Sequence, residues 1–176
     1  MAAAHLPRRF FRALWPGPPR AASVAWVEGI LEPNELALWR ELPNHDRRYT
    51  IAVARRVQQE LAGTEYAGDP RWLAAALLHD TGKLDAGLGI VGRSAATVVG
   101  SLAGSARVAR WRGRAGWRGR VADYRVHDEH GAARIRAAGG REEAARWAYA
   151  HHDADRRAES GIPPVVAEAL RVADDA

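Results

Sequence analysis

Hydrophobic residues recur every three or four positions along much of the chain. The clearest case begins at Asn44 and runs to about Leu61, where Tyr49, Val53 and Val57 follow one another at steps of four. This spacing places their side chains on one face of an α-helix. No segment shows the strict alternation of apolar and polar residues that indicates a half-buried strand. We therefore predict an all-α fold.

Further helices are predicted from the same spacing and from helix-start signals such as Asp69-Pro70 and Pro163-Pro164. They cover residues 8–15, 21–31, 33–42, 70–81, 121–138, 141–152 and 164–174. A Pro-Gly-Pro-Pro run at residues 16–19 separates the first two of these helices. We predict an N-terminal helical extension over residues 1–43, packed on a core domain of five or more helices over residues 44–176.

Composition restricts the chemistry that the chain can carry. The protein has 176 residues and no cysteine, so it forms no disulfide and offers no thiolate to a metal. This fits a single domain in a reducing compartment, and we expect a cytoplasmic location. The longest uncharged stretch in the middle of the chain, residues 94–106, is shorter than the roughly 20 residues of a membrane-spanning helix. We therefore expect a soluble protein with no membrane partner.

Positive charge is concentrated in one part of the chain. The net charge is +5, and the segment Arg107–Arg125 alone contains seven arginines and one aspartate. Trp111 and Trp117 lie among these arginines, and arginine with tryptophan can stack on nucleic-acid bases. A nucleic-acid-binding module is therefore one hypothesis. We favour packing of the two tryptophans on the domain, with the arginines forming a basic, solvated rim.

The candidate chemistry begins with the sequence LLHDTGK at residues 77–83. His79 and Asp80 place an imidazole and a carboxylate side by side at the end of an apolar helix, which Gly82 is expected to terminate. Such a mixed set of donors suits Mn²⁺, Fe or another divalent metal. Lys83, the one lysine of the chain, suits a phosphate oxygen.

More histidines and acids follow on later predicted helices. His127 and His130 open the run HDEHGAARI, and His151 with His152 ends the next helix. In the last helix Asp174 shares a face with two apolar residues, which predicts that its carboxylate points inward. A carboxylate near a helix C-terminus is unfavourable against the helix dipole, and a bound metal would remove that conflict.

LLHDTGK resembles the signature of the HD-domain superfamily of metal-dependent phosphohydrolases. HDEHGAARI, the pair His151-His152 and the ending ALRVADD resemble other elements of HD domains that hold two metals, so the resemblance extends from about Asn44 to Asp174. It implies an HD-domain helical bundle over residues 44–176. It also implies metal ligands: Asp80 bridging two metals, His79 and Asp174 completing the first, and His127 with His151 and His152 holding the second.

The sequence departs from this family at one ligand. HD domains usually place their first metal histidine four residues before a Val-Ala pair, and here Val53-Ala54 puts Tyr49 in that position. Tyr49 is a candidate ligand only if its phenol ionises against the metal, because its ordinary pKa is about 10. His45, one helical turn earlier, is a second candidate. Arg93 is placed where it could reach a bound phosphate.

The resemblance implies hydrolysis of a phosphomonoester or a phosphodiester, with a nucleotide among the candidates, by a hydroxide bound to one or two divalent ions (Mn, Mg, Fe or similar). Asp80 and Lys83 are the expected catalytic residues, and a phosphate-containing small molecule is the expected partner. The alternative is a catalytically degenerate HD domain that binds a nucleotide or a partner protein, which the departure at Tyr49 favours. The nucleic-acid-binding module is the third hypothesis.

Overall fold

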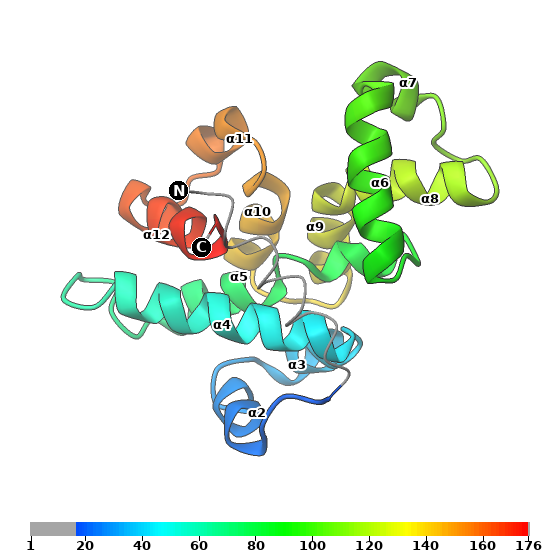
Figure 1. The fold of residues 1–176 in the computed structure, drawn as a ribbon. Helices are drawn as coiled ribbons and strands as arrows, with labels where there is room; N and C mark the ends of the chain where they lie inside the picture. Colours follow the sequence, from blue (N-terminus) through cyan, green and yellow to red (C-terminus); the bar gives the residue numbers. More distant parts are fainter. Residues whose placement is uncertain (1–16, 176) are drawn as a thin grey trace, which may run out of the picture.

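The computed structural model describes residues 17–175, and helices dominate this part of the chain (Figure 1). Eleven α-helices and one short 3-10 helix lie within the described residues, which contain no strand. The prediction of an all-α fold is therefore confirmed. The predicted helix over residues 8–15 lies outside the described residues.

Five α-helices form the body around the site: α4 (Asn44–Glu60), α5 (Pro70–Leu78), α9 (His127–Ala137), α10 (Glu142–Ala150) and α12 (Pro164–Asp175). The others are α2 (Ala21–Glu28), α3 (Pro33–Arg40), α6 (Ile90–Ala103), α7 (Ser105–Ala109), α8 (Trp117–Arg125) and α11 (Ala154–Glu159), with the 3-10 helix η1 (Thr81–Leu84) after α5.

Helix α5 lies at the centre of the body. Asp69 caps it by accepting a hydrogen bond from the backbone N–H of Arg71, and Pro70 occupies the first helical position, as the sequence predicted. Every residue from Trp72 to Leu78 is buried. Helices α3, α4, α10 and α12 all contact α5. Because α5 is enclosed on all sides, the residues that follow its end emerge inside the protein.

Helices α2 and α3 pack on the same core. Val27 and Trp39 are fully buried within it, and the indole N–H of Trp39 donates a hydrogen bond to the hydroxyl of Thr50 in α4, at 3.1 Å. Thr50 is itself buried. The contact satisfies two buried polar groups and connects α3 to α4.

Residues 86–125, here called the arm, project from the body as a separate layer made of α6, α7 and α8 (Figure 1). A small apolar cluster that includes Ala96, Val108 and Val121 holds these three helices together. Gly104, at a φ of 77°, separates α6 from α7. No helix within the described residues is long and apolar enough to cross a membrane.

Candidate metal centre

The first site residues emerge at the end of α5. His79 is the C-cap of this helix and Asp80 is the N-cap of η1, and both side chains are almost fully buried. The chain turns from an α-helix into a tighter 3-10 helix at this point, so the two side chains lie at a junction between elements. The sequence predicted one helix that continued to Gly82, but the α-helix ends earlier, at Leu78.

A second junction directs His127 into the body. The sequence predicted one helix over residues 121–138, but the structure breaks it at Val126, whose φ is −120°. Helix α8 therefore ends at Arg125 and α9 starts at His127. The His127 side chain is buried, whereas His130, one turn later in α9, is half-buried and lies 3.6 Å from Asp85.

Contact between η1 and α9 brings these two junctions together. A Cβ built on Gly82 would lie 1.8 Å from the carbonyl oxygen of His127 and 2.4 Å from the backbone nitrogen of Gly131. Only glycine permits so close an approach of backbones. Gly82 is predicted from the sequence to terminate a helix, and its packing against α9 adds this second requirement for glycine.

Three histidines share one local hydrogen-bonding pattern. In His79, His127 and His151 the ring atom Nδ1 pairs with the backbone carbonyl three residues earlier, at 2.9, 2.8 and 2.8 Å respectively. A carbonyl oxygen only accepts, so Nδ1 carries a proton in each ring. The Nε2 atoms of His127 and His151 are buried and have no hydrogen-bond partner among the described residues, whereas Nε2 of His79 faces Asp174. Histidines whose Nδ1–H is fixed by a backbone carbonyl are typical metal ligands through Nε2.

Two carboxylates face these imidazoles. One oxygen of Asp80 lies 3.4 Å from Nε2 of His79, and its other oxygen lies 3.7 Å from Nε2 of His127. Oδ1 of Asp174 lies 3.2 Å from Nε2 of His79. Two donors that each lie roughly 2.1 Å from a shared metal are about 3.0 to 3.5 Å apart, depending on the coordination angle. The spacing of these groups therefore fits a divalent ion with little movement.

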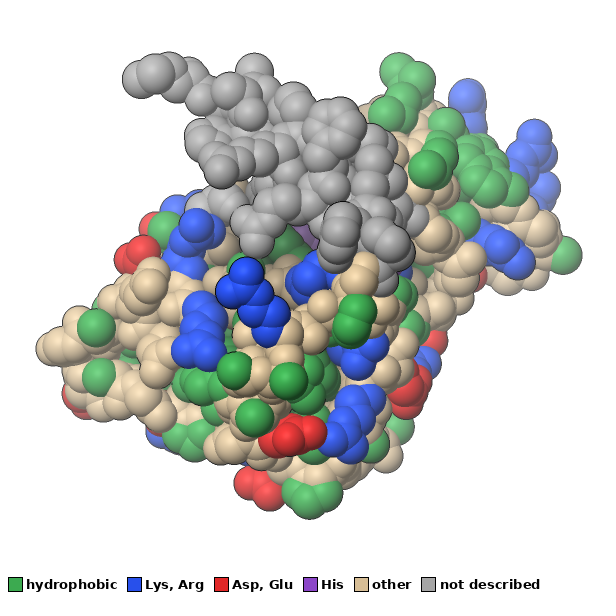
Figure 2. Space-filling model, turned by 60° about the horizontal axis from the view of Figure 1, so that its bottom comes forward, with side chains coloured by type: hydrophobic (Ala, Val, Ile, Leu, Met, Phe, Trp, Pro, Cys, Tyr) green, Lys and Arg blue, Asp and Glu red, His purple; other side chains and the backbone are tan. Residues whose placement is uncertain are grey.

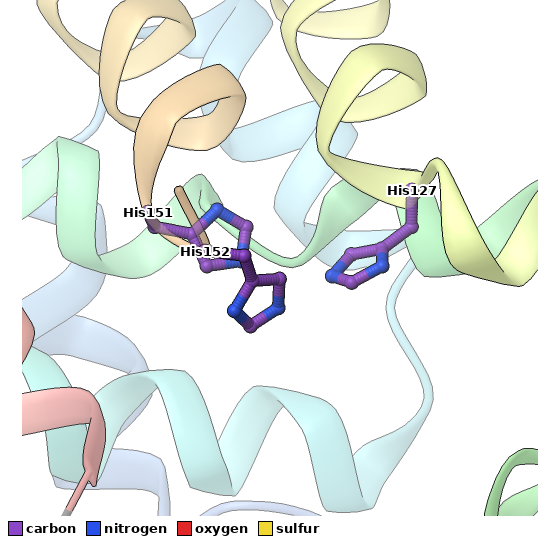
Figure 3. A group of neighbouring side chains, drawn as sticks. All are labelled: His127, His151 and His152. Carbon is purple, nitrogen blue, oxygen red and sulfur yellow. The ribbon is translucent and has the colours of Figure 1, made fainter. Parts of the chain in front are cut away.

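His127, His151 and His152 form a group of their own, in which one ligand atom from each residue lies within 4.8 Å of the others (Figure 3). The first ring comes from the start of α9, and the other two come from the end of α10. His152 is exposed, whereas the other two rings are buried. Three imidazoles are a donor set that suits Zn, Fe, Ni or Cu as well as Mn.

The electrostatics of the two sides of the site differ. Burial opposes a charge on His79, but the carboxylates of Asp80 and Asp174 outweigh burial and raise its pKa to about 9. Burial, together with the positive charge of Lys83, lowers the pKa of His127 to about 4. Burial and the neighbouring His79 also lower the pKa of His151. At neutral pH the Nε2 atoms of His127 and His151 are therefore unprotonated.

Lys83 completes the charge balance. Its Nζ lies 2.5 Å from Oδ2 of Asp80. Burial favours neutral Lys83, but the attraction of Asp80 outweighs it and raises the pKa of the ammonium group. Burial also opposes charge on Asp80, and His79 and Lys83 together lower its pKa well below the ordinary value. Lys83 and Asp80 are therefore a charged pair within the site.

Tyr49 contacts the site through a hydrogen bond to Asp174. Its hydroxyl donates to Oδ1 of Asp174 and lies 2.8 Å from the backbone oxygen of the same residue. The structure therefore gives Tyr49 the role of a hydrogen-bond donor to a candidate ligand. Burial raises the pKa of Asp174, but the neighbouring His79 and, to a smaller degree, the Tyr49 hydroxyl lower it below its ordinary value.

His45 and Arg93 both contact Asp46, which the sequence pattern did not single out. Both oxygens of the buried Asp46 accept hydrogen bonds from Arg93, at 2.9 and 2.7 Å, and Nε2 of His45 lies 3.2 Å from Oδ1. The guanidinium group of Arg93 is therefore engaged by α4. Asp46 lies four residues before Thr50 and seven before Val53, on the buried face of the helix. That spacing is the signal that could have identified it.

The described residues thus bring together His79, Asp80, Lys83, His127, His151, His152 and Asp174, with Tyr49 at the edge and His45 and Arg93 joined to Asp46. Comparison with models of known protein families, with curated proteins and with solved structures finds no match for this chain. The site must therefore be interpreted from its own geometry and chemistry.

Proposed function

We propose that this protein is a metal-dependent phosphohydrolase of the HD-domain type, acting on a phosphomonoester or a phosphodiester, with a nucleotide among the candidate substrates. The observation that carries the proposal is the pair of buried Nε2 atoms, on His127 and His151, that have no hydrogen-bond partner among the described residues and lie near the Asp80 carboxylate, which also faces His79. Buried polar atoms are nearly always satisfied. A divalent cation between these donors would satisfy them together.

The donors divide into two groups around Asp80. His127, His151 and His152 would hold one cation together with Asp80, and His79 with Asp174 and Asp80 would hold a second. A divalent cation bound here supplies a Lewis acid that lowers the pKa of water toward neutrality and offsets phosphate charge. One or two ions per chain are consistent with this division.

The other residues of the site orient groups and balance charge. Lys83 places an ammonium group beside Asp80, where it can meet an oxygen of the substrate phosphate and stabilise the negative charge that develops there. Tyr49 holds Asp174 through its hydroxyl, which fixes the direction of that carboxylate. Asp46 fixes the guanidinium group of Arg93 and approaches His45.

A degenerate domain that binds a nucleotide or a partner protein is the second candidate, and Tyr49 is the observation that favours it. A neutral phenol that donates to Asp174 leaves the group around His79 one imidazole short of the full HD-domain set. In this alternative the ligand binds but no phosphate is released. Replacing Tyr49 by histidine would then restore turnover.

Phosphate release from p-nitrophenyl phosphate, bis(p-nitrophenyl) phosphate and a panel of nucleotides, measured with added Mn²⁺, tests the proposal. The wild-type protein and Tyr49→His are compared with His127→Ala, and His130→Ala serves as a matched control from the same helix. Activity in the wild type that is lost in His127→Ala and retained in His130→Ala supports the enzyme. Activity only in Tyr49→His supports the degenerate domain. No release by either protein would contradict both.

A further inference from the structure

The outward face of α6 is apolar, and no other described residues cover it. Val91, Ala95, Val98 and Leu102 lie at steps of four, three and four residues, which places them on one side of the helix. The relative exposures of Val91, Val98 and Leu102 are 71, 58 and 83%. The opposite side contributes Ala96 to the small cluster of the arm. When a helix carries apolar side chains on both sides, both sides are normally shielded from water by contact with another surface.

The rest of the arm is strongly cationic. No acidic residue occurs between Asp85 and Asp123. Six arginines in this interval are exposed: Arg107, Arg110, Arg112, Arg114, Arg118 and Arg120. Among the described residues only Arg112 of these six forms an ion pair, with Glu129 of α9. Trp117, at the start of α8, is also exposed.

Hydrophobic and basic side chains lie beside one another at the outer end of the arm (Figure 2). We propose that the arm docks peripherally on an anionic membrane surface. The apolar face of α6 then enters the boundary between headgroups and acyl chains, and the arginines contact lipid phosphates. Exposed tryptophan is typical of this interface. We expected no membrane partner because no segment could span a bilayer, but peripheral docking needs no spanning helix.

The positive charge and the exposed apolar side chains of the arm together favour a membrane surface over a second copy of the chain and over a nucleic acid. A second copy packed on the same face would bring two groups of unpaired arginines together, and like charges oppose such contact. A nucleic acid would neutralise the arginines but leave the aliphatic face of α6 in water, since bases stack on aromatic rings. A lipid surface offers phosphates and hydrocarbon at adjacent depths, which matches the mixture of side chains on the arm.

Co-sedimentation of the full chain with lipid vesicles tests the proposal. We expect binding to vesicles of phosphatidylcholine with one third phosphatidylglycerol, little binding to phosphatidylcholine alone, and weaker binding as salt increases. Val98→Glu is expected to reduce partition at least tenfold. Val165→Glu is the matched control, because Val165 is an exposed valine of α12 in the body, and it should bind as the wild type does.

The arginines are tested separately with Arg107→Gln and Arg110→Gln, each expected to weaken partition about fivefold. Arg20→Gln serves as the control, because Arg20 is exposed and lies outside the arm, before α2. Absence of binding to anionic vesicles overturns the proposal, as does an equal loss in Val98→Glu and Val165→Glu. Binding to a single-stranded oligonucleotide without binding to vesicles overturns it in favour of nucleic acid. Dimers that Val98→Glu dissociates, again without vesicle binding, overturn it in favour of a second copy.

Discussion

Replacing Gly82 by alanine introduces a Cβ into the contact between η1 and α9. That atom would lie 1.8 Å from the carbonyl oxygen of His127, which is backbone and cannot rotate away. Restoring ordinary van der Waals contact requires the two backbones to separate by roughly 1.5 Å. Functional sites tolerate displacements of only about 0.5 Å in their ligands. We therefore expect Gly82→Ala to separate Asp80 from His127 and to weaken metal binding.

The size of the effect follows from overpacking. Forcing an extra methyl group into a close-packed contact typically destabilises a protein by about 1 to 3 kcal/mol, and backbone contact places Gly82→Ala at the upper end. Urea unfolding measures the free energy of unfolding, and calorimetric titration with Mn²⁺ measures affinity. Gly89→Ala is the matched control, because Gly89 has a φ of −70° and a Cβ there would meet nothing within 4 Å. Wild-type stability and affinity in Gly82→Ala would refute the reasoning.

Three further outcomes are expected. Lys83→Gln should reduce the rate of phosphate release by about 100-fold, because it removes one donor to the negative charge that develops on the phosphate. Metal content should be retained. Initial rates measure the first effect, and elemental analysis measures the second. In EDTA, the contribution of His127 to the free energy of unfolding should fall by about 3 kcal/mol as pH decreases from 6.5 to about 4, because burial and Lys83 lower the pKa of His127 in the folded state and the unfolded chain takes up the proton first. Urea unfolding across this range should therefore show a smaller loss of stability in His127→Asn than in the wild type. Leu77→Ala, at a fully buried position of α5, should cost about 2 to 5 kcal/mol in thermal or urea unfolding, and a smaller cost than that of the exposed Leu102→Ala would contradict the central place of α5.

The helices were predictable wherever local signals and packing agree. Asp69 caps the start of α5 with its carboxylate, and Pro70 occupies the first helical position. The apolar residues that follow are all buried. The boundaries at Leu78 and Val126 were not predictable from periodicity, because the chain continues to favour helix through both. Both helix ends lie where η1 packs against α9. This packing depends on a contact between Gly82 and residues almost fifty positions later in the chain, which periodicity does not reveal.

The site was predictable to a similar degree. Side chains that bear donor atoms are visible in the sequence, so His79, Asp80, His127 and His151 could be named as candidates. Their common pairing of Nδ1 with a carbonyl three residues earlier could not be named, because it depends on backbone geometry at three helix ends. Asp46 was missed because a polar residue near the start of a helix is ordinarily solvated, although its spacing to Thr50 and Val53 places it on the buried face, where it pairs with Arg93.

Metal content per chain is the most direct test of the account. The protein is loaded with Mn²⁺ or Zn²⁺, dialysed to remove weakly bound ions and analysed by elemental mass spectrometry, together with His127→Ala, His151→Ala and the control His130→Ala. The account predicts one or two tightly held ions in the wild type and in His130→Ala, with loss of at least one ion from each of the other two variants. No retained metal in the wild type, or equal retention in all four proteins, would contradict it.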